Sequence, residues 1–164
     1  MIKTPTQVAL DLLKEFEQGP TGSFAAMPYL CPAGKKTIGY GHVIRPTDHF
    51  RPPLSADQAE ALLRADLEFF AQGVADLIRT IPLTQSMFDA LCCLAFNIGM
   101  SNFSGSTLLT KLKRRDYVGA AAEFLRWNKA RNPKTGKLDV LPGLSRRRDA
   151  ERQLFLRGGF PAPP

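Results

Sequence analysis

The chain contains 164 residues, of which 44% are hydrophobic and 23% are charged, so it has a globular composition and enough material for a sizeable core. Its 22 lysines and arginines outnumber its 15 acidic residues, and the net charge of +7 favours a polyanionic partner such as nucleic acid, anionic lipid or bacterial wall. The longest apolar run, residues 90–96, is far shorter than the roughly 20 residues that cross a bilayer, which argues against a membrane anchor.

The N-terminus and the cysteines bear on the compartment. Residues 1–18 carry acidic side chains and lack the apolar centre of a secretory signal, so we expect the chain to stay in a cytoplasm until it is released. The three cysteines, Cys31, Cys92 and Cys93, are an odd number without metal-type spacing, which predicts neither a disulfide framework nor a metal site. Cys92 and Cys93 lie in the most apolar stretch and are expected to be buried.

The N-terminal third predicts one helix followed by irregular chain. A helix is expected over residues 4–17, because its apolar side chains share one face, and turn-forming residues after position 18 end it. The segment 36–43 alternates β-prone residues with glycines, which is typical of a short strand or hairpin. It lies within an irregular region that we expect over residues 20–54.

The remainder predicts helices. Ser55 and Gln58 form a capping-box signal that opens an apolar stripe, and Pro82 ends that stripe. The next helix, over 84–98, is hydrophobic nearly all round and is expected to be the central core helix. Shorter helices are expected over 106–114 and 116–127, followed by a polar loop and a basic helix over 144–157.

These elements predict an α+β fold that is mainly α. We expect a single domain of residues 1–164, in which a small mixed lobe of about residues 15–55 carries the β-hairpin. A long helix joins it to a larger helical lobe of residues 1–14 and 56–160, with an active-site cleft between the lobes.

Glu17 is the first candidate for chemistry. It falls where the first helix is expected to end, near carbonyl groups whose partial negative charge disfavours a carboxylate. That placement favours the protonated form, which a general acid in glycoside hydrolysis requires. No phosphate-binding loop, dinucleotide fingerprint or metal cluster is visible in the sequence, so no cofactor is expected.

Around Glu17 the sequence resembles the phage lysozyme family, glycoside hydrolase family 24. The resemblance is carried by residues 16–19, FEQG, and 29–42, YLCPAGKKTIGYGH, and it continues through residues 96–112 and 141–155. The family motif is a Glu, then an Asp or Cys, then five residues and a Thr, and Cys31 and Thr37 have that spacing. The resemblance implies a lysozyme-like fold and an endolysin that lyses the host cell by hydrolysing peptidoglycan. The bond cut would be the β-1,4 bond between N-acetylmuramic acid and N-acetylglucosamine, with inversion of configuration.

The resemblance also implies roles for particular residues. Glu17 would be the catalytic acid, Cys31 would occupy the second catalytic position, and Thr37 would help to position the nucleophilic water. Four further positions would line the saccharide cleft, namely Val43, Phe96, Asn97 and Ser106. Release from the host bacterial cytoplasm to the periplasmic cell wall would need a holin as partner.

Two departures from the motif leave alternatives open. Thirteen residues separate Glu17 from Cys31 where the motif has eight, which indicates a lengthened loop and leaves Glu15 as a rival acid. A thiol is a poorer base than an aspartate, so Cys31 could also be a packing residue, and Thr37 with a water could carry more of the work.

Other features have less specific explanations. His42 is expected to make a structural hydrogen bond between the hairpin and the other lobe, and Trp127 is expected to pack in the core or between lobes. The arginines of the last helix are expected to be solvated or to pair with Asp149 and Glu151. One of them could hold the catalytic glutamate, and the basic helix could contact an anionic outer membrane.

Competing functions remain at this level. Lytic transglycosylation of the same bond needs chiefly one acid, and a weakened peptidoglycan-binding module needs none. A nucleic-acid-binding domain would call for clustered aromatics or a helix-turn-helix, which the sequence does not display, so no nucleic acid is expected. We expect a monomer.

Overall fold

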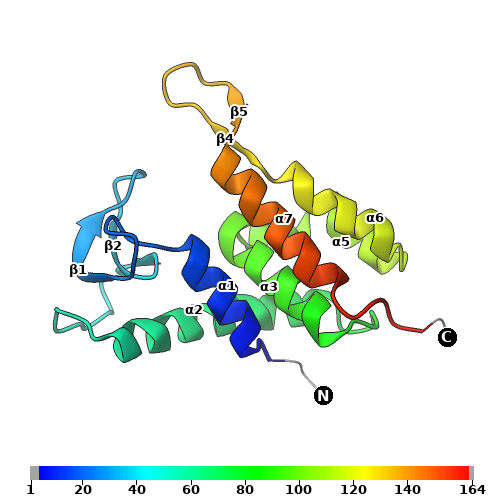
Figure 1. Cartoon of the computed structure of the whole chain (residues 1–164), viewed down its shortest axis with the longest axis horizontal. Coiled ribbons are helices and arrows are strands. Elements are labelled where there is room, and N and C mark those ends of the chain that lie inside the picture. Colours follow the sequence, from blue (N-terminus) through cyan, green and yellow to red (C-terminus); the bar gives the residue numbers. More distant parts are fainter. Residues whose placement is uncertain (1–3, 163–164) are drawn as a thin grey trace.

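The computed structural model describes residues 4–162, and the two ends of the predicted domain, 1–3 and 163–164, lie outside the described residues. The helices and strands follow one another from α1 to α7, as Figure 1 shows. Their bounds are α1 (Gln7–Phe16), β1 (Ala25–Leu30), β2 (Lys36–Gly39), β3 (His42–Val43), α2 (Ala56–Leu77), α3 (Gln85–Ile98), α4 (Met100–Ser104), α5 (Thr107–Lys113), α6 (Tyr117–Glu123), the 3₁₀ helix η1 (Phe124–Arg126), β4 (Lys129–Arg131), β5 (Leu138–Val140) and α7 (Pro142–Leu156). The predicted mainly helical α+β class is confirmed.

Helix α3 is the core helix, as predicted. Thr84 caps it, its side chain accepting a hydrogen bond from the Met87 N–H at 3.3 Å, and Gly99 ends it with φ at 84°. Every residue from Met87 to Ala95 is buried, including Cys92 and Cys93, and α1, α2 and α7 pack around them. Burial of a side chain such as Leu91 contributes roughly 1.5–3 kcal/mol, so this helix accounts for much of the core.

The first and second helices are tied to this core by specific side chains. Asp89 of α3 is buried and accepts hydrogen bonds from the N–H and the hydroxyl of Thr6, the residue before α1, at 3.1 and 2.5 Å. The capping box of Ser55 and Gln58 opens α2, as predicted. Helix α2 ends at Leu77, before the predicted break at Pro82, because the chain leaves the helix in a turn ahead of the proline.

The three-stranded antiparallel sheet has the order β1-β2-β3. The predicted hairpin over 36–43 is confirmed as β2 and β3, whereas the expectation of irregular chain was wrong for β1. Strand β1 contains Pro28, and its pairing with β2 shifts between Ala25 and Tyr29. A proline cannot donate to the ladder, so it lies at this irregularity and hides the strand from a pattern search.

The predicted polar loop after Trp127 is also corrected, since it holds a second hairpin of β4 and β5. Asn132 organises its turn: its side-chain oxygen accepts from the Lys134 N–H at 2.9 Å, and its carbonyl accepts from the Gly136 N–H at 2.8 Å. In Figure 1 this hairpin projects beyond the start of α7.

Helix α7 closes the fold by packing along α3 (Figure 1). It begins two residues earlier than predicted because Pro142 suits the first helical turn. Leu154 and Phe155 enter the core, and so do three charged residues, Arg147, Arg148 and Glu151. The arginines of this helix were expected to be solvated or to pair with acidic residues, and two of them are buried in the core together with Glu151.

Candidate active site

Glu17 lies where the sequence predicts it, at the C-terminal end of α1. Its N–H donates to the Leu13 carbonyl at 2.7 Å, and its φ and ψ of −100° and 43° leave the helical region. Its side chain is 19% exposed, so the carboxylate is shielded but can still be reached from solvent. This combination suits a group that must hold a proton and then give it to a substrate.

Arg147 of α7 reaches Glu17 from 130 positions away in the chain. Its Nη1 donates to Glu17 Oε1 at 2.5 Å, and its Nε donates to Glu151 Oε1 at 3.1 Å. The Arg147 side chain is only 5% exposed. Burial lowers the pKa of Arg147, but the charges of Glu17 and Glu151 outweigh burial and raise it. The hydrogen bond from Arg147 therefore fixes Oε1 of Glu17 in place.

The other oxygen of Glu17 lies against a glycine turn. Gly41, between β2 and β3, has φ at 79°, a backbone conformation that side chains disfavour. A Cβ at this position would lie 3.1 Å from Glu17 Oε2. Two independent constraints therefore favour glycine at position 41: the positive φ of the turn and the close approach of the Glu17 carboxylate.

Cys31 directly follows β1, in the turn of residues 31–34. Its N–H donates to the Lys35 carbonyl at 2.9 Å, and its own carbonyl accepts from the Gly34 N–H at 2.8 Å. Hydrogen bonding from the Lys35 backbone lowers the pKa of the Cys31 thiol, and the Ala33 backbone and the Lys35 charge add to this against an opposing effect of burial. These surroundings stabilise the thiolate of Cys31 relative to that of an ordinary cysteine.

Thr37 of β2 is 2% exposed and faces the same turn. Its hydroxyl donates to the Lys35 carbonyl at 3.0 Å, which leaves the oxygen lone pairs available as acceptors. Tyr29 lies within electrostatic range of both Cys31 and Glu17, because burial and the charges of these two residues together raise the pKa of its phenol. The turn and β2 therefore bring Cys31 and Thr37 together, and Gly41 of the same hairpin lies next to Glu17.

His42 links the hairpin to α2, as predicted. Its Nδ1 pairs with Asp66 Oδ2 at 2.6 Å, its Nε2 pairs with Asp48 Oδ2 at 3.0 Å, and the ring is 5% exposed. The Asp66 hydrogen bond raises the pKa of His42, assisted by Asp48 and opposed by burial. His42 itself lowers the pKa of Asp48, with help from the Arg45 N–H. These pairs hold the glycine turn in position against α2.

The four predicted saccharide contacts are dispersed. Val43 is exposed and pairs with Thr37 across β2 and β3, so it lies beside the catalytic candidates. Asn97 is exposed at the end of α3, while Phe96 next to it is partly buried against Phe70 at a ring-centroid distance of 5.3 Å. Ser106 is buried and lies on the first turn of α5.

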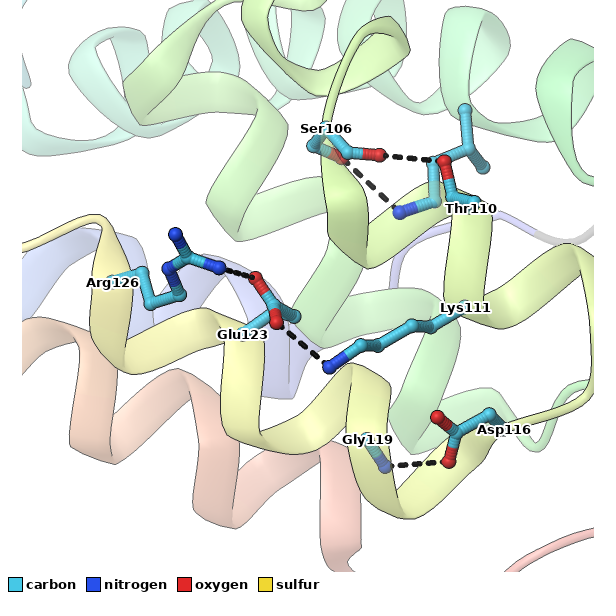
Figure 2. Close-up of polar contacts among 8 residues, drawn as sticks. Ser106, Thr110, Lys111, Asp116, Gly119, Glu123 and Arg126 are labelled. Carbon is cyan, nitrogen blue, oxygen red and sulfur yellow. Dashed lines mark hydrogen bonds and ion pairs between the residues drawn. The ribbon is translucent and has the colours of Figure 1, made fainter.

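Ser106 is held by backbone bonds, some of which Figure 2 draws. Its hydroxyl donates to the Phe103 carbonyl at 2.7 Å and accepts from the Leu109 N–H at 3.1 Å, so it caps α5. Nearby, Glu123 accepts from Lys111 at 2.8 Å and from Arg126 at 3.2 Å, as the dashed lines in Figure 2 mark. The two sets of contacts are separate, and Ser106 and Glu123 meet only as residues that line the same cavity.

Two cavities include residues considered above, and Glu17 lines neither of them. One of about 630 Å³ lies between α1 and α7 and includes Glu15, which is exposed. The other, of about 380 Å³, is lined by Ser106, Glu123, Trp127 and other polar residues. Trp127 is partly buried against the core and also borders this cavity, so the predicted packing role is confirmed. Neither Cys31 nor Thr37 lines the cavity that Glu15 borders, so Glu15 lies apart from these two candidates.

Sequence reasoning missed the specific partners of the candidates. It predicted that some arginine could hold the glutamate, but not that Arg147 does so, nor that Gly41 touches the carboxylate. The signal was present: residues 144, 147, 148, 151, 154 and 155 have helical spacing on one face, and charged residues occupy the middle of that stripe. Of the two acidic partners predicted for the arginines, Glu151 binds both Arg147 and Arg148. Asp149 instead accepts from Gln153 at 2.9 Å.

Comparison with known proteins gives consistent relatives. The model of the phage lysozyme family matches residues 20–151. An endolysin of Acyrthosiphon pisum secondary endosymbiont phage 1 is 44% identical over 92% of this chain and 96% of its own length. An endolysin of Bacillus phage B103 is 40% identical over 93% of this chain, which spans 54% of that longer protein. A SAR-endolysin of Escherichia phage Mu is 36% identical over 83% of this chain and 75% of its own.

Solved structures agree with the sequence relatives. The endolysin of Escherichia coli O157:H7 phage FAHEc1 has a TM-score of 0.83 at 31% identity and covers 98% of both chains. The muramidase domain of SpmX from Asticaccaulis excentricus has a TM-score of 0.80 at 34% identity, covering 92% of this chain and 96% of the other. The predicted lysozyme-like architecture is confirmed. Within residues 4–162, the structure contains no helix with both the length and the apolar character needed to span a bilayer.

Proposed function

Because the chain belongs to the phage lysozyme family and is a peptidoglycan-degrading muramidase of the endolysin type, we propose that Glu17 is the proton donor of its hydrolytic reaction. The observation that carries this assignment is the asymmetry of the Glu17 carboxyl group. Arg147 occupies Oε1, and an arginine can only donate hydrogen bonds, so the proton to be transferred belongs on Oε2. That oxygen faces the glycine turn.

The reaction breaks the bond between C1 of N-acetylmuramic acid and O4 of N-acetylglucosamine. Glu17 gives its Oε2 proton to O4 as that bond breaks, and the oxygen of a water molecule bonds to C1. Arg147 stabilises the carboxylate that remains, because its buried positive charge lies 2.5 Å from Oε1. Glu17 regains its proton from solvent before the next turnover, which its partial exposure permits.

Cys31 and Thr37 are proposed to handle the water. The Thr37 hydroxyl hydrogen is directed to the Lys35 carbonyl, so its oxygen can accept a hydrogen bond from the water. Hydrogen bonding from the Lys35 backbone lowers the pKa of the Cys31 thiol. As a thiolate, Cys31 can take the other hydrogen of the water as a proton when the water attacks C1. Attack from the side opposite the leaving group gives the inverted product.

The substrate extends from this centre along four proposed contacts. Val43 is exposed and adjacent to Thr37, and Asn97 is exposed at the end of α3, so both can meet a sugar directly. Phe96 and Ser106 are more enclosed, and their proposed contribution is to shape the surface beside the glycan strand.

The test compares the wild type with Glu17→Gln on purified peptidoglycan at matched folding, followed by mass spectrometry of the soluble fragments. We expect the wild type to release fragments with reducing ends and the variant to be nearly inactive while keeping its circular dichroism spectrum. Fragments lighter by one water would instead identify transglycosylation. Binding without release would identify a wall-binding module, and an active Glu17→Gln variant would remove Glu17 as the acid.

Access to the wall is a separate part of the proposal. The endolysin relationship supports a protein that remains in the host cytoplasm until a holin releases it to the periplasmic wall. Expression in a bacterial host with and without a holin tests this, because lysis that needs no holin would contradict it. The proposed contact with an anionic outer membrane rests on two exposed arginines, Arg146 of α7 and Arg157 directly after it. Binding of Arg146→Gln/Arg157→Gln to anionic vesicles should be weaker than that of the wild type.

A further inference from the structure

Glu151 is a buried carboxylate that the reaction described above does not use. It is 0% exposed, and its Oε1 accepts two hydrogen bonds, from Arg147 Nε at 3.1 Å and from Arg148 Nη2 at 2.8 Å. Arg148 is also 0% exposed. Glu17, Arg147, Glu151 and Arg148 therefore form one continuous chain of hydrogen bonds, which we call the buried charge chain.

The buried charge chain is electrically balanced only in one state of Glu17. Two arginines and two carboxylates sum to zero when Glu17 is ionised, and to +1 when Glu17 holds its proton. Without the charge of Glu151, the two states would carry +1 and +2. A more positive surrounding favours the loss of a proton, so Glu151 opposes the tendency of the arginines to strip Glu17 of the proton that it must deliver.

Other ionisable groups around the buried charge chain do not replace this effect. From α3, Cys93 interacts with Glu151 and Arg147, but burial raises the pKa of its thiol well above the ordinary value and keeps it neutral. From β1, the Tyr29 phenol is influenced by the charge of Glu17, and neither Arg147 nor Arg148 is among the groups that shift its pKa. The pKa of Glu151 is raised by burial and by the charge of Glu17, against the opposing charges of Arg148 and Arg147.

Stability gives a weak account of this arrangement. Within residues 4–162, Glu151 Oε2, Arg147 Nη2 and both Arg148 Nε and Nη1 are buried without a hydrogen-bond partner in the protein. Buried polar atoms left unpaired cost free energy, and buried ion pairs can often be replaced by apolar side chains without loss of stability. The contacts that are satisfied are those that orient Arg147 toward Glu17.

We propose that Glu151 is a positioning residue of the muramidase reaction. It holds the Arg147 guanidinium against Glu17 and offsets the arginine charge beside the proton donor. Arg148 acts in the opposite electrical direction, by holding Glu151 and adding a positive charge. This inference rests on the proposed role of Glu17 as proton donor.

The first experiment measures the initial rate of peptidoglycan lysis against pH for Glu151→Gln. We expect the alkaline limb of the profile, where activity is lost as pH rises, to move down by on the order of one pH unit, so that activity on that limb falls about tenfold. Asp149→Asn is the matched control, because it removes the same charge from an exposed position of the same helix. Its alkaline limb should stay in place.

Two further variants make the result decisive. Arg148→Met removes a positive charge and should move the limb upward, and the double variant Arg148→Met/Glu151→Gln restores the balance and should return it close to the wild-type position. The double variant is also expected to fold where a single variant does not, because it leaves no unpaired charge behind. Thermal unfolding of each variant reports folding independently.

The outcomes separate this inference from the proposed function. An inactive Glu17→Gln with an unmoved limb in Glu151→Gln would overturn the role of Glu151 and keep that of Glu17. An active Glu17→Gln would remove the proposed function itself. If the double variant were as unstable as the single variants, or if its limb did not return, the buried charge chain would be a packing feature and the inference would be wrong.

Discussion

Replacing Gly41 with alanine tests how closely the glycine turn and the acid are fitted to each other. Gly41 has φ at 79°, and a left-handed conformation costs alanine roughly 1–2 kcal/mol. The loss of chain entropy in the unfolded state returns about 0.4–1 kcal/mol of this cost. We therefore expect a net destabilisation of about 1 kcal/mol, which lowers the Tm by about 2–4 °C in a protein of this size.

The expected loss of activity has a different origin. The new Cβ would lie 3.1 Å from Glu17 Oε2, so the carboxylate must move by a few tenths of an ångström. Since a misplacement of about 1 Å can cost about a hundredfold in rate, a shift of this size should reduce activity about four- to tenfold. Turbidity loss of a peptidoglycan suspension, measured at a temperature well below the Tm of both proteins, gives the comparison.

Gly136→Ala is the matched control for this experiment. Gly136 has φ at 70° in the β4–β5 hairpin, and a Cβ there would meet no atom within 4 Å. It should lose similar stability and retain full activity. The reasoning fails if Gly41→Ala keeps wild-type activity, or if Gly136→Ala loses as much activity as Gly41→Ala.

Three further predictions concern the cysteines, His42 and Ser106. At neutral pH, Ellman's reagent should titrate the partly exposed Cys31 rapidly, and the two buried thiols of α3 only after denaturation; three fast thiols in the native protein would contradict the packing of that helix. Because the pKa of His42 is raised, chiefly by Asp66, its contribution to stability is complete below the unfolded value of about 6.5 and is lost as pH rises through the folded value. Tm measured against pH should show this loss in the wild type, and Asp66→Asn should flatten it; equal slopes would be evidence against the pair. Ser106→Ala should lower stability by about 1–2 kcal/mol through loss of the α5 cap, seen as a lower urea midpoint, and an unchanged KM would remove Ser106 from the saccharide contacts.

Local signals in the sequence were sufficient for the longer helices, whereas the short helix α4 was not predicted. The capping box at Ser55 and the apolar run of α3 depend on neighbours only a few residues apart, and such interactions act in the same way in any fold. Strand β1 and the hairpin of β4 and β5 were missed for the opposite reason. Strand β1 contains Pro28 and pairs irregularly, and strands β4 and β5 are exposed on most of their residues, so neither region displays an alternating apolar pattern.

The same distinction between local sequence signals and contacts that depend on the fold applies to the candidate site. The position of Glu17 at the end of α1 followed from local chain chemistry, and Cys31 and Thr37 from a motif of fixed spacing. Arg147 could not be chosen from three consecutive arginines, because only the packing of α7 on α3 decides which of them face inward. The contact between Gly41 and Glu17 depends on the approach of two segments, and no residue pattern encodes such a distance.

The late position of α7 in the chain sets the timing of activity during synthesis. A nascent chain emerges from its N-terminus, so Glu17 is exposed long before Arg147 has been made. Until α7 docks, Glu17 has no cationic partner and one face of α3 remains uncovered. The enzyme is therefore expected to be inactive until α7 has been synthesised and has folded. The docking of α7 then covers α3 and brings Arg147 to Glu17 in the same step.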